Sequence, residues 1–393
     1  MLTLPSRRSV LSGLALVPAL AVAPHGAWAV PEGEGAAALP DASSTAPSLS
    51  RAARNSGRYF GAAARADHLR QDRALRAAVL RDCDVLTPEI HLKWNSLEWR
   101  KGQFNFAPVD DLLAFSEDNG LRVRGHTLLW EQSTPDWARR DLLEQRDWRL
   151  MSEHFSRVLG RYGSRINEWD VINEPIDTET GARNLRRNTF FHAFGPTYIE
   201  RAMEEARAHA PQAHLVINDY GFEYGNPVDK ARRQAFVALL RRLRAADVPL
   251  DGAGVQAHLD LSKGPIDKVG LQDMTKALID LGLDITVTEL DVKEAEGAHS
   301  TTARDQKVAD ETRRYLDIML AFPEVRGVVT WGLTDKFSWL TEQIDARVRS
   351  VRGVNRGLPY DESYRPKPMY WALSDSLGVS SQATPAGKLD HWT

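Results

Sequence analysis

The feature that most constrains the fold is a regular alternation of strand-like and helix-like segments. Short apolar and β-branched runs are each followed by a longer segment with helical periodicity. Eight such units in about 320 residues predict a single-domain (β/α)8 barrel, the TIM barrel of the α/β class. The expected strands span residues 59–64, 85–90, 121–130, 166–174, 214–220, 254–259, 284–291 and 325–332. The expected helices span residues 67–81, 109–119, 148–162, 196–209, 229–245, 266–281, 303–322 and 366–377.

An open, doubly wound α/β sheet would alternate in the same way. The dinucleotide-binding version of that sheet carries a Gly-x-Gly-x-x-Gly turn after its first strand, and this sequence has none. The sequence also contains no internal repeat and no sign of a second globular domain. The barrel is therefore the favoured architecture.

The first 29 residues are typical of an export signal. Arg7 and Arg8 precede an apolar stretch, and Ala27-Trp28-Ala29 provides a small-x-small cleavage site. This pattern resembles the bacterial twin-arginine signal, and the apolar stretch is too short for a permanent membrane anchor. We expect a mature protein in the periplasm or outside the cell, without membrane attachment once the signal is removed. A disordered cytoplasmic tail is the alternative interpretation.

Composition sets the remaining domain boundaries and excludes several functions. Residues 30–54 resemble a flexible linker, residues 55–380 form the expected catalytic barrel, and residues 381–393 form a tail. With 50 basic and 53 acidic residues, the chain has a formal net charge of −3 and no general attraction to nucleic acid. The single Cys83 excludes an internal disulfide, and no Cys/His cluster has the spacing of a metal site.

Two of the expected strands end in carboxylates. The strand over 166–174 ends in Asn173 and Glu174, and the strand over 284–291 carries Glu289 and Asp291. Barrel enzymes build their active sites at the C-terminal ends of the strands. We expect the fourth and seventh strands to lie on opposite sides of the ring, so that Glu174 and Glu289 face each other. Retaining glycoside hydrolysis requires such a pair, whereas solvated surface acids are the alternative.

The neighbouring residues suggest different roles for the two carboxylates. His258 can reach Glu289 from the adjacent strand, and Asp291 can orient His258, which favours the charged form of Glu289. Glu174 has no comparable cationic partner, which suits a residue that carries a proton. The other residues at the strand ends are polar or aromatic and fit an uncharged polyol better than a nucleotide.

Eight ordered motifs give the chain a family resemblance. They resemble those of family 10 glycoside hydrolases, the endo-β-1,4-xylanases, over residues 55–380. The motifs are Thr87-Pro88-Glu89, Lys93-Trp94, the run from Arg124 to Trp130, the run from Trp169 to Glu174, the run from Ile217 to Tyr220, Gln256-Ala257-His258, the run from Thr288 to Asp291, and Trp331-Gly332.

The resemblance implies a retaining enzyme that acts on xylan or a related β-glycan without a cofactor. Glu174 then matches the acid/base and Glu289 the nucleophile, while Asn173 matches the residue that binds the sugar 2-hydroxyl. His258 and Asp291 support Glu289. The resemblance also assigns substrate-binding roles to Glu89, Lys93, His126, Trp130, Gln256, Trp331 and Trp339, and to Asn218 and Tyr220 on the acceptor side. We expect the chain to act as a monomer.

Three departures from the family pattern leave the substrate open. Ile90 stands where the family has a sugar-binding Asn, and Glu131-Gln132-Ser133 replaces His-Ser-Gln. The third departure is a basic loop over residues 341–356, which is either solvated or contacts acidic groups such as glucuronyl branches. Its arginines, with one residue just beyond, are Arg347, Arg349, Arg352, Arg356 and Arg365.

Two alternatives to an endo-xylanase remain on the sequence. One is a retaining β-glycosidase of the same fold that acts on another polysaccharide or on short oligosaccharides, which the departures at Ile90 and at Glu131-Gln132-Ser133 favour. The other is a carbohydrate-binding protein without catalytic activity.

Overall fold

The computed structural model describes residues 46–294, 300–342 and 353–379, all of which belong to the compact unit formed by residues 37–393. The expected signal (1–29), most of the expected linker and the expected tail (381–393) lie outside the described residues. None of the described helices is both long and apolar enough to cross a membrane.

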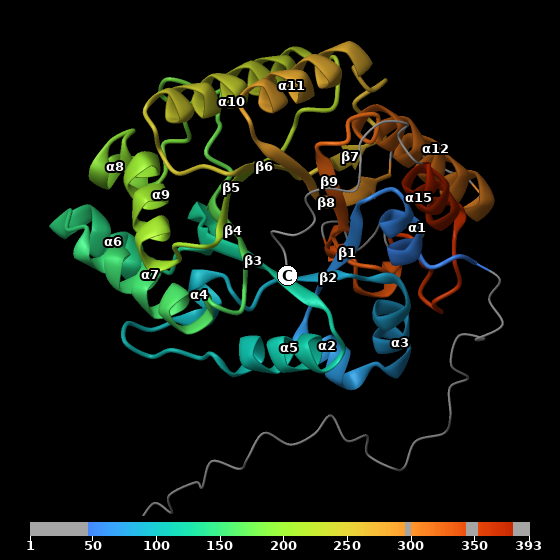
Figure 1. The fold of residues 1–393 in the computed structure, drawn as a ribbon, viewed down its shortest axis with the longest axis horizontal. Helices are drawn as coiled ribbons and strands as arrows, with labels where there is room; N and C mark the ends of the chain where they lie inside the picture. The colour runs from blue at the N-terminus through green and yellow to red at the C-terminus, as the bar shows by residue number, and fades with distance from the viewer. Residues whose placement is uncertain (1–45, 295–299, 343–352, 380–393) are drawn as a thin grey trace, which may run out of the picture. The chain divides into compact units, whose positions relative to one another are not determined.

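Eight parallel strands close into a barrel, which confirms the predicted (β/α)8 fold. Around the ring the order is β1-β2-β3-β4-β5-β6-β8-β9, and β9 pairs with β1 to complete the circle (Figure 1). The short strand β7 (His258–Asp260) pairs only with the end of β8. The ring strands are β1 (Tyr59–Ala64), β2 (Val85–Pro88), β3 (Arg122–Leu129), β4 (Glu168–Asn173), β5 (His214–Asp219), β6 (Gly252–Val255), β8 (Asp284–Lys293) and β9 (Val325–Thr330).

Helices surround the ring of strands (Figure 1). Those that lie between or after successive strands are α2 (Ala66–Gln71), α3 (Arg73–Asp82), α5 (Ala107–Asp118), α7 (Arg149–Tyr162), α9 (Tyr198–His209), α10 (Pro227–Ala245), α11 (Lys268–Asp280), α12 (Thr301–Met319) and α15 (Pro368–Gly378). Further helical segments in the loops are α4 (Trp94–Leu97), the 3-10 turn η1 (Glu131–Ser133), α6 (Asp136–Gln145), α8 (Thr189–Phe194), η2 (Asp335–Phe337) and α13 (Trp339–Glu342).

The folded domain begins earlier than the sequence predicted. Helix α1 (Leu49–Asn55) lies in the stretch assigned to the flexible linker, and Ser48 caps its first turn. Leu49, Ala52 and Ala53 are buried. A helix of two turns among alanines and serines gives too short a pattern to distinguish from a linker.

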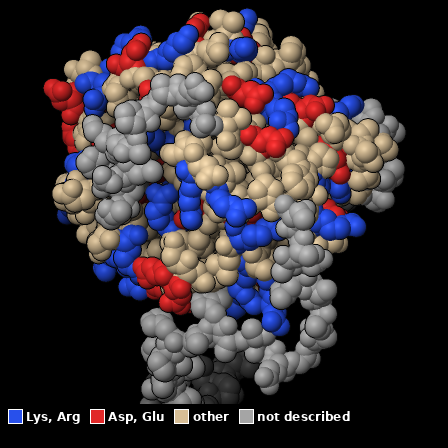
Figure 2. Space-filling model, turned by 45° about the vertical axis from the view of Figure 1, so that its right-hand side comes forward, with Lys and Arg blue, Asp and Glu red and all other residues tan. Residues whose placement is uncertain are grey.

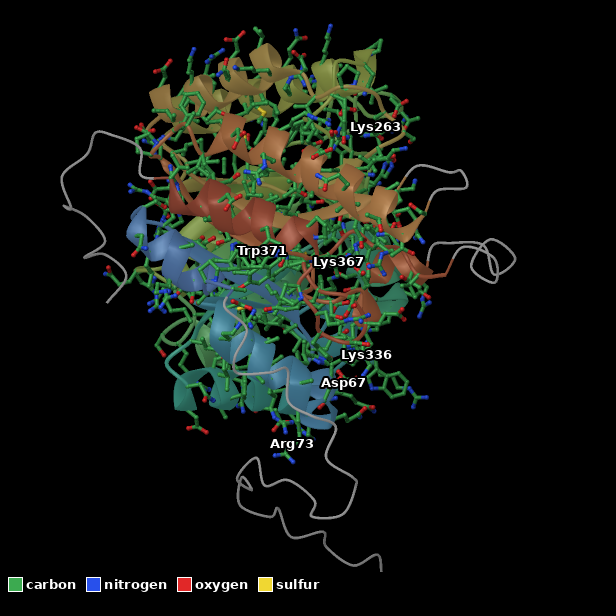
Figure 3. The ribbon with its side chains drawn as sticks, turned by 90° about the vertical axis from the view of Figure 1, so that its right-hand side faces the viewer. Asp67, Arg73, Lys263, Lys336, Lys367 and Trp371 are labelled. Atoms are coloured by element: carbon green, nitrogen blue, oxygen red, sulfur yellow. The ribbon has the colours of Figure 1, made fainter. Side chains whose placement is uncertain are left out.

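The C-terminal helix joins the two ends of the domain. Helix α15 packs against α1 and α12 (Figures 1 and 3). The Tyr370 hydroxyl bonds with Pro47 O at 2.7 Å and with the buried Asp82 carboxylate at 2.9 Å. Asp82 also accepts a hydrogen bond from the backbone N–H of Leu49 at 3.1 Å. These bonds connect α15, which is near the end of the domain's sequence, with α1 and α3, which are near its beginning.

Two expectations about the strands were wrong. The sixth strand was predicted as one segment over 254–259, but Ala257 adopts a left-handed conformation (φ 63°) that separates β6 from β7. The fourth and seventh strands, β4 and β8, were expected on opposite sides of the ring. Only β5 and β6 lie between them, so the two strands are three steps apart.

A buried ion network connects β3 and β4 inside the barrel. The guanidinium group of Arg124 binds both Glu168 and Asp170, with Nη1 at 2.6 Å from Asp170 Oδ2. Asp170 Oδ2 also lies 2.9 Å from His126 Nδ1. These contacts give Asp170 a structural role, and the network fixes the ring of His126. On the face shown in Figure 2, basic side chains gather over the centre and lower part, and acidic side chains form smaller groups around them.

Replacement of Arg124 tests how strongly the barrel depends on this network. Arg124→Met leaves two buried carboxylates without their cation, and we expect a loss of about 3–5 kcal/mol in the free energy of unfolding, measured by urea titration. Arg326→Met is the matched control, because Arg326 forms a partly exposed bond of 2.9 Å with Asp284 between β9 and β8. The control should lose less than about 1 kcal/mol. Equal losses in the two variants would contradict the role given to the buried network.

Candidate active site

A cavity of about 450 Å³ opens at the C-terminal ends of the strands and gathers almost all of the predicted site residues. The predicted residues that line it are Glu89, Lys93, His126, Trp130, Asn173, Glu174, Tyr220, Gln256, His258, Glu289, Asp291, Trp331 and Trp339. The residues that the sequence did not single out as binding residues are Gln132, Leu259, Asp260, Lys263, Lys293 and Leu340.

Glu289 lies on β8 with its carboxylate almost completely buried. Asn218 Nδ2 donates a hydrogen bond of 2.6 Å to Oε1, and His258 Nε2 lies 3.3 Å from Oε2. The other nitrogen of His258, Nδ1, lies 2.8 Å from Asp291 Oδ1. The predicted sequence of contacts from Asp291 through His258 to Glu289 is therefore present.

These contacts keep Glu289 ionised. Burial opposes the charge, but His126, with Nδ1 at 4.0 Å from Oε1, together with His258 and Lys93, lowers the pKa of Glu289 to about 2. Burial also disfavours charge on His258, yet Asp291 and Glu289 raise the pKa of His258 well above its ordinary value. At neutral pH the site thus holds a protonated His258 between two carboxylates.

Lys93 supplies a further positive charge in an aromatic setting. Its Nζ lies 4.6 Å from the ring centroid of Trp130 and 5.6 Å from that of Trp331. Burial lowers the pKa of Lys93, while the nearby carboxylates of Glu289 and Glu89 act in the opposite direction. Cation–π contacts hold the ammonium group in place over two walls of the cavity.

Glu174 follows the last residue of β4 and occupies a strained backbone position. Its φ is 57°, in the left-handed region that non-glycine residues rarely adopt, and its N–H donates to Asn218 O at 2.8 Å. Such strain is concentrated at functional sites. The Oε1 atom lies 3.4 Å from both Asn173 Nδ2 and Gln256 Nε2. Within the described residues, no cationic side chain forms an ion pair with this carboxylate.

Asn218 has a different place from the one that the family resemblance implied. It was expected to bind substrate on the acceptor side, but it is fully buried and does not line the cavity. Thr288 Oγ1 donates to Asn218 Oδ1 at 2.7 Å, which directs the amide Nδ2 towards Glu289 and towards Asn173 Oδ1 at 2.8 Å. Asn218 therefore positions two site residues from behind.

Three tryptophans form apolar walls around the carboxylates. Trp339 Nε1 donates to Asp291 Oδ2 at 2.5 Å, and the ring of Trp331 meets His126 edge-on with centroids 5.1 Å apart. Trp130 faces Lys93. By contrast, Trp94 is buried and stacks on His154, with the ring centroids 4.1 Å apart.

The residues that depart from the family pattern differ in whether they line the cavity. Glu131 does not line the cavity, because its carboxylate binds Arg139 at 2.6 Å and the Thr189 N–H at 2.9 Å. Gln132 does line it, whereas Ile90 does not.

The structure describes two of the five arginines assigned to the basic loop and the residue just beyond it. Arg356 binds Asp305 at 2.6 Å and Arg365 binds Asp361 at 2.7 Å, so both are paired within the chain. Arg347, Arg349 and Arg352 lie outside the described residues.

Arg186 is a site residue that sequence reasoning missed. It comes from the long loop after β4, where no strand or motif marks it. Its Nε donates to the backbone carbonyl of Glu174 at 2.9 Å, and Nη2 bonds with the Tyr220 hydroxyl at 3.2 Å. Arg186 therefore connects the strained turn at Glu174 with the wall at Tyr220.

The barrel and its cavity define a class of enzyme. Two carboxylates, one held ionised and one without an ion pair, lie among aromatic and amide side chains at the mouth of a (β/α)8 barrel. This arrangement defines a glycoside hydrolase of the two-carboxylate type. No group of His, Cys, Asp and Glu in the described ranges could hold a metal ion.

The chain belongs to glycosyl hydrolase family 10, whose model matches residues 48–376. It is 31% identical to endo-1,4-beta-xylanase B of Thermotoga neapolitana over 303 residues, which cover 76% of this chain and 81% of that protein. It is 30% identical to endo-1,4-beta-xylanase A of Phanerodontia chrysosporium, over 86% of this chain and 79% of that protein.

Solved structures agree with this membership. Native xylanase 10B from Thermotoga maritima matches with a TM-score of 0.73 and 29% identity, over 84% of this chain and 98% of that one. Xylanase 10B from Thermotoga petrophila, solved with xylobiose, has the same TM-score and identity, over 84% of this chain and 97% of that one.

The charge on His258 should control the acidic limb of activity. His258→Gln keeps a hydrogen-bond donor but removes the positive charge, so the pKa of Glu289 should rise from about 2 towards its ordinary value of 4.5. The nucleophile would then lose its charge as the pH falls through that range. The pH profile of kcat/KM for an aryl β-glycoside should show activity lost at higher pH than in the wild type. His209→Gln, which removes a surface contact with Glu205, is the control. An unchanged acidic limb in His258→Gln would contradict this account.

Proposed function

We propose that the chain is an endo-β-1,4-xylanase that cleaves internal bonds of xylan with retention of configuration. The observation that carries the proposal is the contrast between its two carboxylates. Glu289 has a pKa of about 2 and four positively charged or polar neighbours, whereas the Glu174 carboxylate, among the described residues, forms hydrogen bonds with neutral amides. Retaining hydrolysis needs this contrast, because one acid must remain ionised while the other carries a proton. The xylanases among the relatives support xylan as the substrate.

In the first step, Glu289 attacks the anomeric carbon of the sugar from its α face, opposite the β-linked glycosidic oxygen. The bond from that carbon to the glycosidic oxygen breaks, and Glu174 gives its proton to the departing oxygen. An ester between the sugar and Glu289 results, and Glu174 becomes a carboxylate. The hydrogen bonds from His258 and Asn218 hold the nucleophile in one orientation for the attack.

In the second step, Glu174 takes a proton from water, which attacks the same carbon. The ester bond breaks, Glu289 leaves as a carboxylate, and Glu174 is again protonated. Asn173 lies at the centre of the hydrogen bonds that connect the two acids, since Asn218 and Gln256 both donate to its Oδ1 at 2.8 and 3.2 Å. Its Nδ2 is thus directed into the cavity, where it suits the sugar 2-hydroxyl.

A second candidate keeps the chemistry but changes the substrate to short oligosaccharides or another β-glycan. The apolar Ile90, at the position where the family resemblance implies a sugar-binding Asn, favours it, although Ile90 does not line the cavity. The two candidates differ in the lengths of their first products, since an endo enzyme releases a broad range of fragments from the polymer and an exo enzyme releases one short product.

Substitution of either carboxylate tests the mechanism. Glu174→Gln should lower the release of reducing sugar from xylan by about 10²–10⁴-fold, because the acid/base is lost. Glu289→Gln should abolish turnover, because no ester can form. On an aryl glycoside with a good leaving group, Glu174→Ala should still form the ester, and added azide should then restore turnover.

The control for these variants is Glu117→Gln, since Glu117 is an exposed acid of α5 that binds Arg165. It should behave as the wild type does. Full activity in Glu289→Gln would contradict the proposal. In the same assay, a single short product from the earliest times would favour the second candidate.

The proposal includes export of the enzyme as a monomer. The pair Arg7-Arg8, the apolar stretch and Ala27-Trp28-Ala29 support a twin-arginine signal. Replacement of both arginines by lysine should retain the precursor in the cytoplasm, as cell fractionation would show. Unchanged export would contradict the signal, and a light-scattering mass of two chains would contradict the monomer.

A further inference from the structure

A second cavity, of about 490 Å³, lies beside the catalytic one and takes no part in the reaction described above. One wall comes from the segment 95–101, around the end of α4, and the other from the segment 132–140, which contains the start of α6. Gln132 lines both cavities, so they share a boundary. The second cavity is named here the α4–α6 groove. Its basic and aromatic lining residues are Trp99, Arg100, Lys101, Trp137, Arg139 and Arg140.

The walls of the α4–α6 groove are fixed by bonds between its two segments and within them. Trp137 Nε1 donates to the backbone carbonyl of Glu98 at 2.9 Å, and Lys101 Nζ lies 2.6 Å from Asp141 Oδ2. Arg139 donates to Thr134 O at 2.9 Å. Because these bonds are made within the chain, the groove exists before any ligand arrives, which reduces the entropy cost of binding.

Two of the four basic side chains in the groove have an acidic partner among the described residues, and two have none. Lys101 is paired with Asp141, and Arg139 is paired with Glu131 at 2.6 Å. Arg100 and Arg140 are exposed and form no ion pair with any described residue. Asp136 is the single carboxylate among the lining residues. Two guanidinium groups therefore remain available for an anion from outside, and a planar guanidinium suits a carboxylate in particular.

Trp99 adds an aromatic surface to these cations. Its side chain is 57% exposed, more than that of any other large hydrophobic residue in the described ranges except Val269 and Val379. The guanidinium carbon of Arg100 lies 4.2 Å from the ring centroid. An exposed indole beside free cations offers an apolar face to a sugar ring and a charge to its substituent.

We propose that the α4–α6 groove binds an acidic sugar substituent on the polysaccharide whose backbone occupies the catalytic cavity. Arg100 and Arg140 bind the carboxylate of a uronic acid branch, and Trp99 contacts its ring. The shared boundary at Gln132 provides the continuity that a single polymer needs. The inference rests on the proposed function and names its substrate more closely, as an acid-substituted β-xylan. It also moves acid recognition away from Arg356 and Arg365, which are paired within the chain.

The test compares two forms of one substrate, glucuronoxylan and the same polymer after chemical reduction of its carboxyl groups. The wild type should show a higher kcat/KM on the acidic form. The double variant Arg100→Gln/Arg140→Gln should lose about three- to tenfold of this preference and keep its activity on the reduced form. The preference of the wild type should also fall between about 0.05 and 0.5 M NaCl, because the cations are exposed.

The matched control is Arg51→Gln/Arg241→Gln, which removes two exposed arginines of α1 and α10 that line neither cavity. It should retain the preference. An unchanged preference in the groove variant, or an equal loss in both double variants, would overturn the proposal.

Failure of the proposed function looks different, since the wild type would then hydrolyse neither polymer. In that case the groove is still tested by calorimetric titration of Glu289→Gln with a uronic-acid-substituted xylo-oligosaccharide, with and without the two groove substitutions. Equal affinity in the two proteins would overturn the proposal.

Discussion

The active site depends on a negative charge that is kept on one buried carboxylate, that of Glu289. Transfer of an isolated carboxylate out of water is costly, and a group in that position normally takes up a proton instead. Glu289 does not, because protonated His258 and Lys93 supply positive charge, His126 lies close by and Asn218 supplies a hydrogen bond. His126 is buried, and His258 and Lys93 are partly buried, so each needs its own support. Asp291 holds His258, Asp170 holds His126, and two tryptophan rings hold Lys93.

The barrel brings these groups together from separate strands. His126 comes from β3, Asn218 from β5 and Glu289 from β8, and a parallel ring presents their ends on one face. His258 arrives differently, since the left-handed Ala257 ends β6 and lets β7 pair with the end of β8, where His258 lies opposite Asp291. Ala257 and Glu174, both in left-handed conformations, thus lie where the regular strands end and the active-site residues begin.

Much of this arrangement was predictable because it follows from local patterns. Strand β1 has the predicted bounds, and the carboxylates at 174 and 289 stand out since a buried run rarely ends in acids. The contacts of His258 were predicted from its place beside the Glu289 strand. What the sequence did not reveal depends on non-local geometry. The burial of Asn218 behind Glu289 and the separation of β6 from β7 depend on strand register and one backbone angle. The α4–α6 groove depends on two loops that only the fold brings together.

The most direct test of the account is to identify the residue that forms the ester. An activated 2-deoxy-2-fluoro β-xylobioside forms the ester quickly and releases it slowly, so the labelled enzyme can be digested and its peptides sequenced by mass spectrometry. The account predicts one added disaccharide, on Glu289. A label on Glu174 or on another residue, or hydrolysis of the substrate without any covalent adduct, would contradict it.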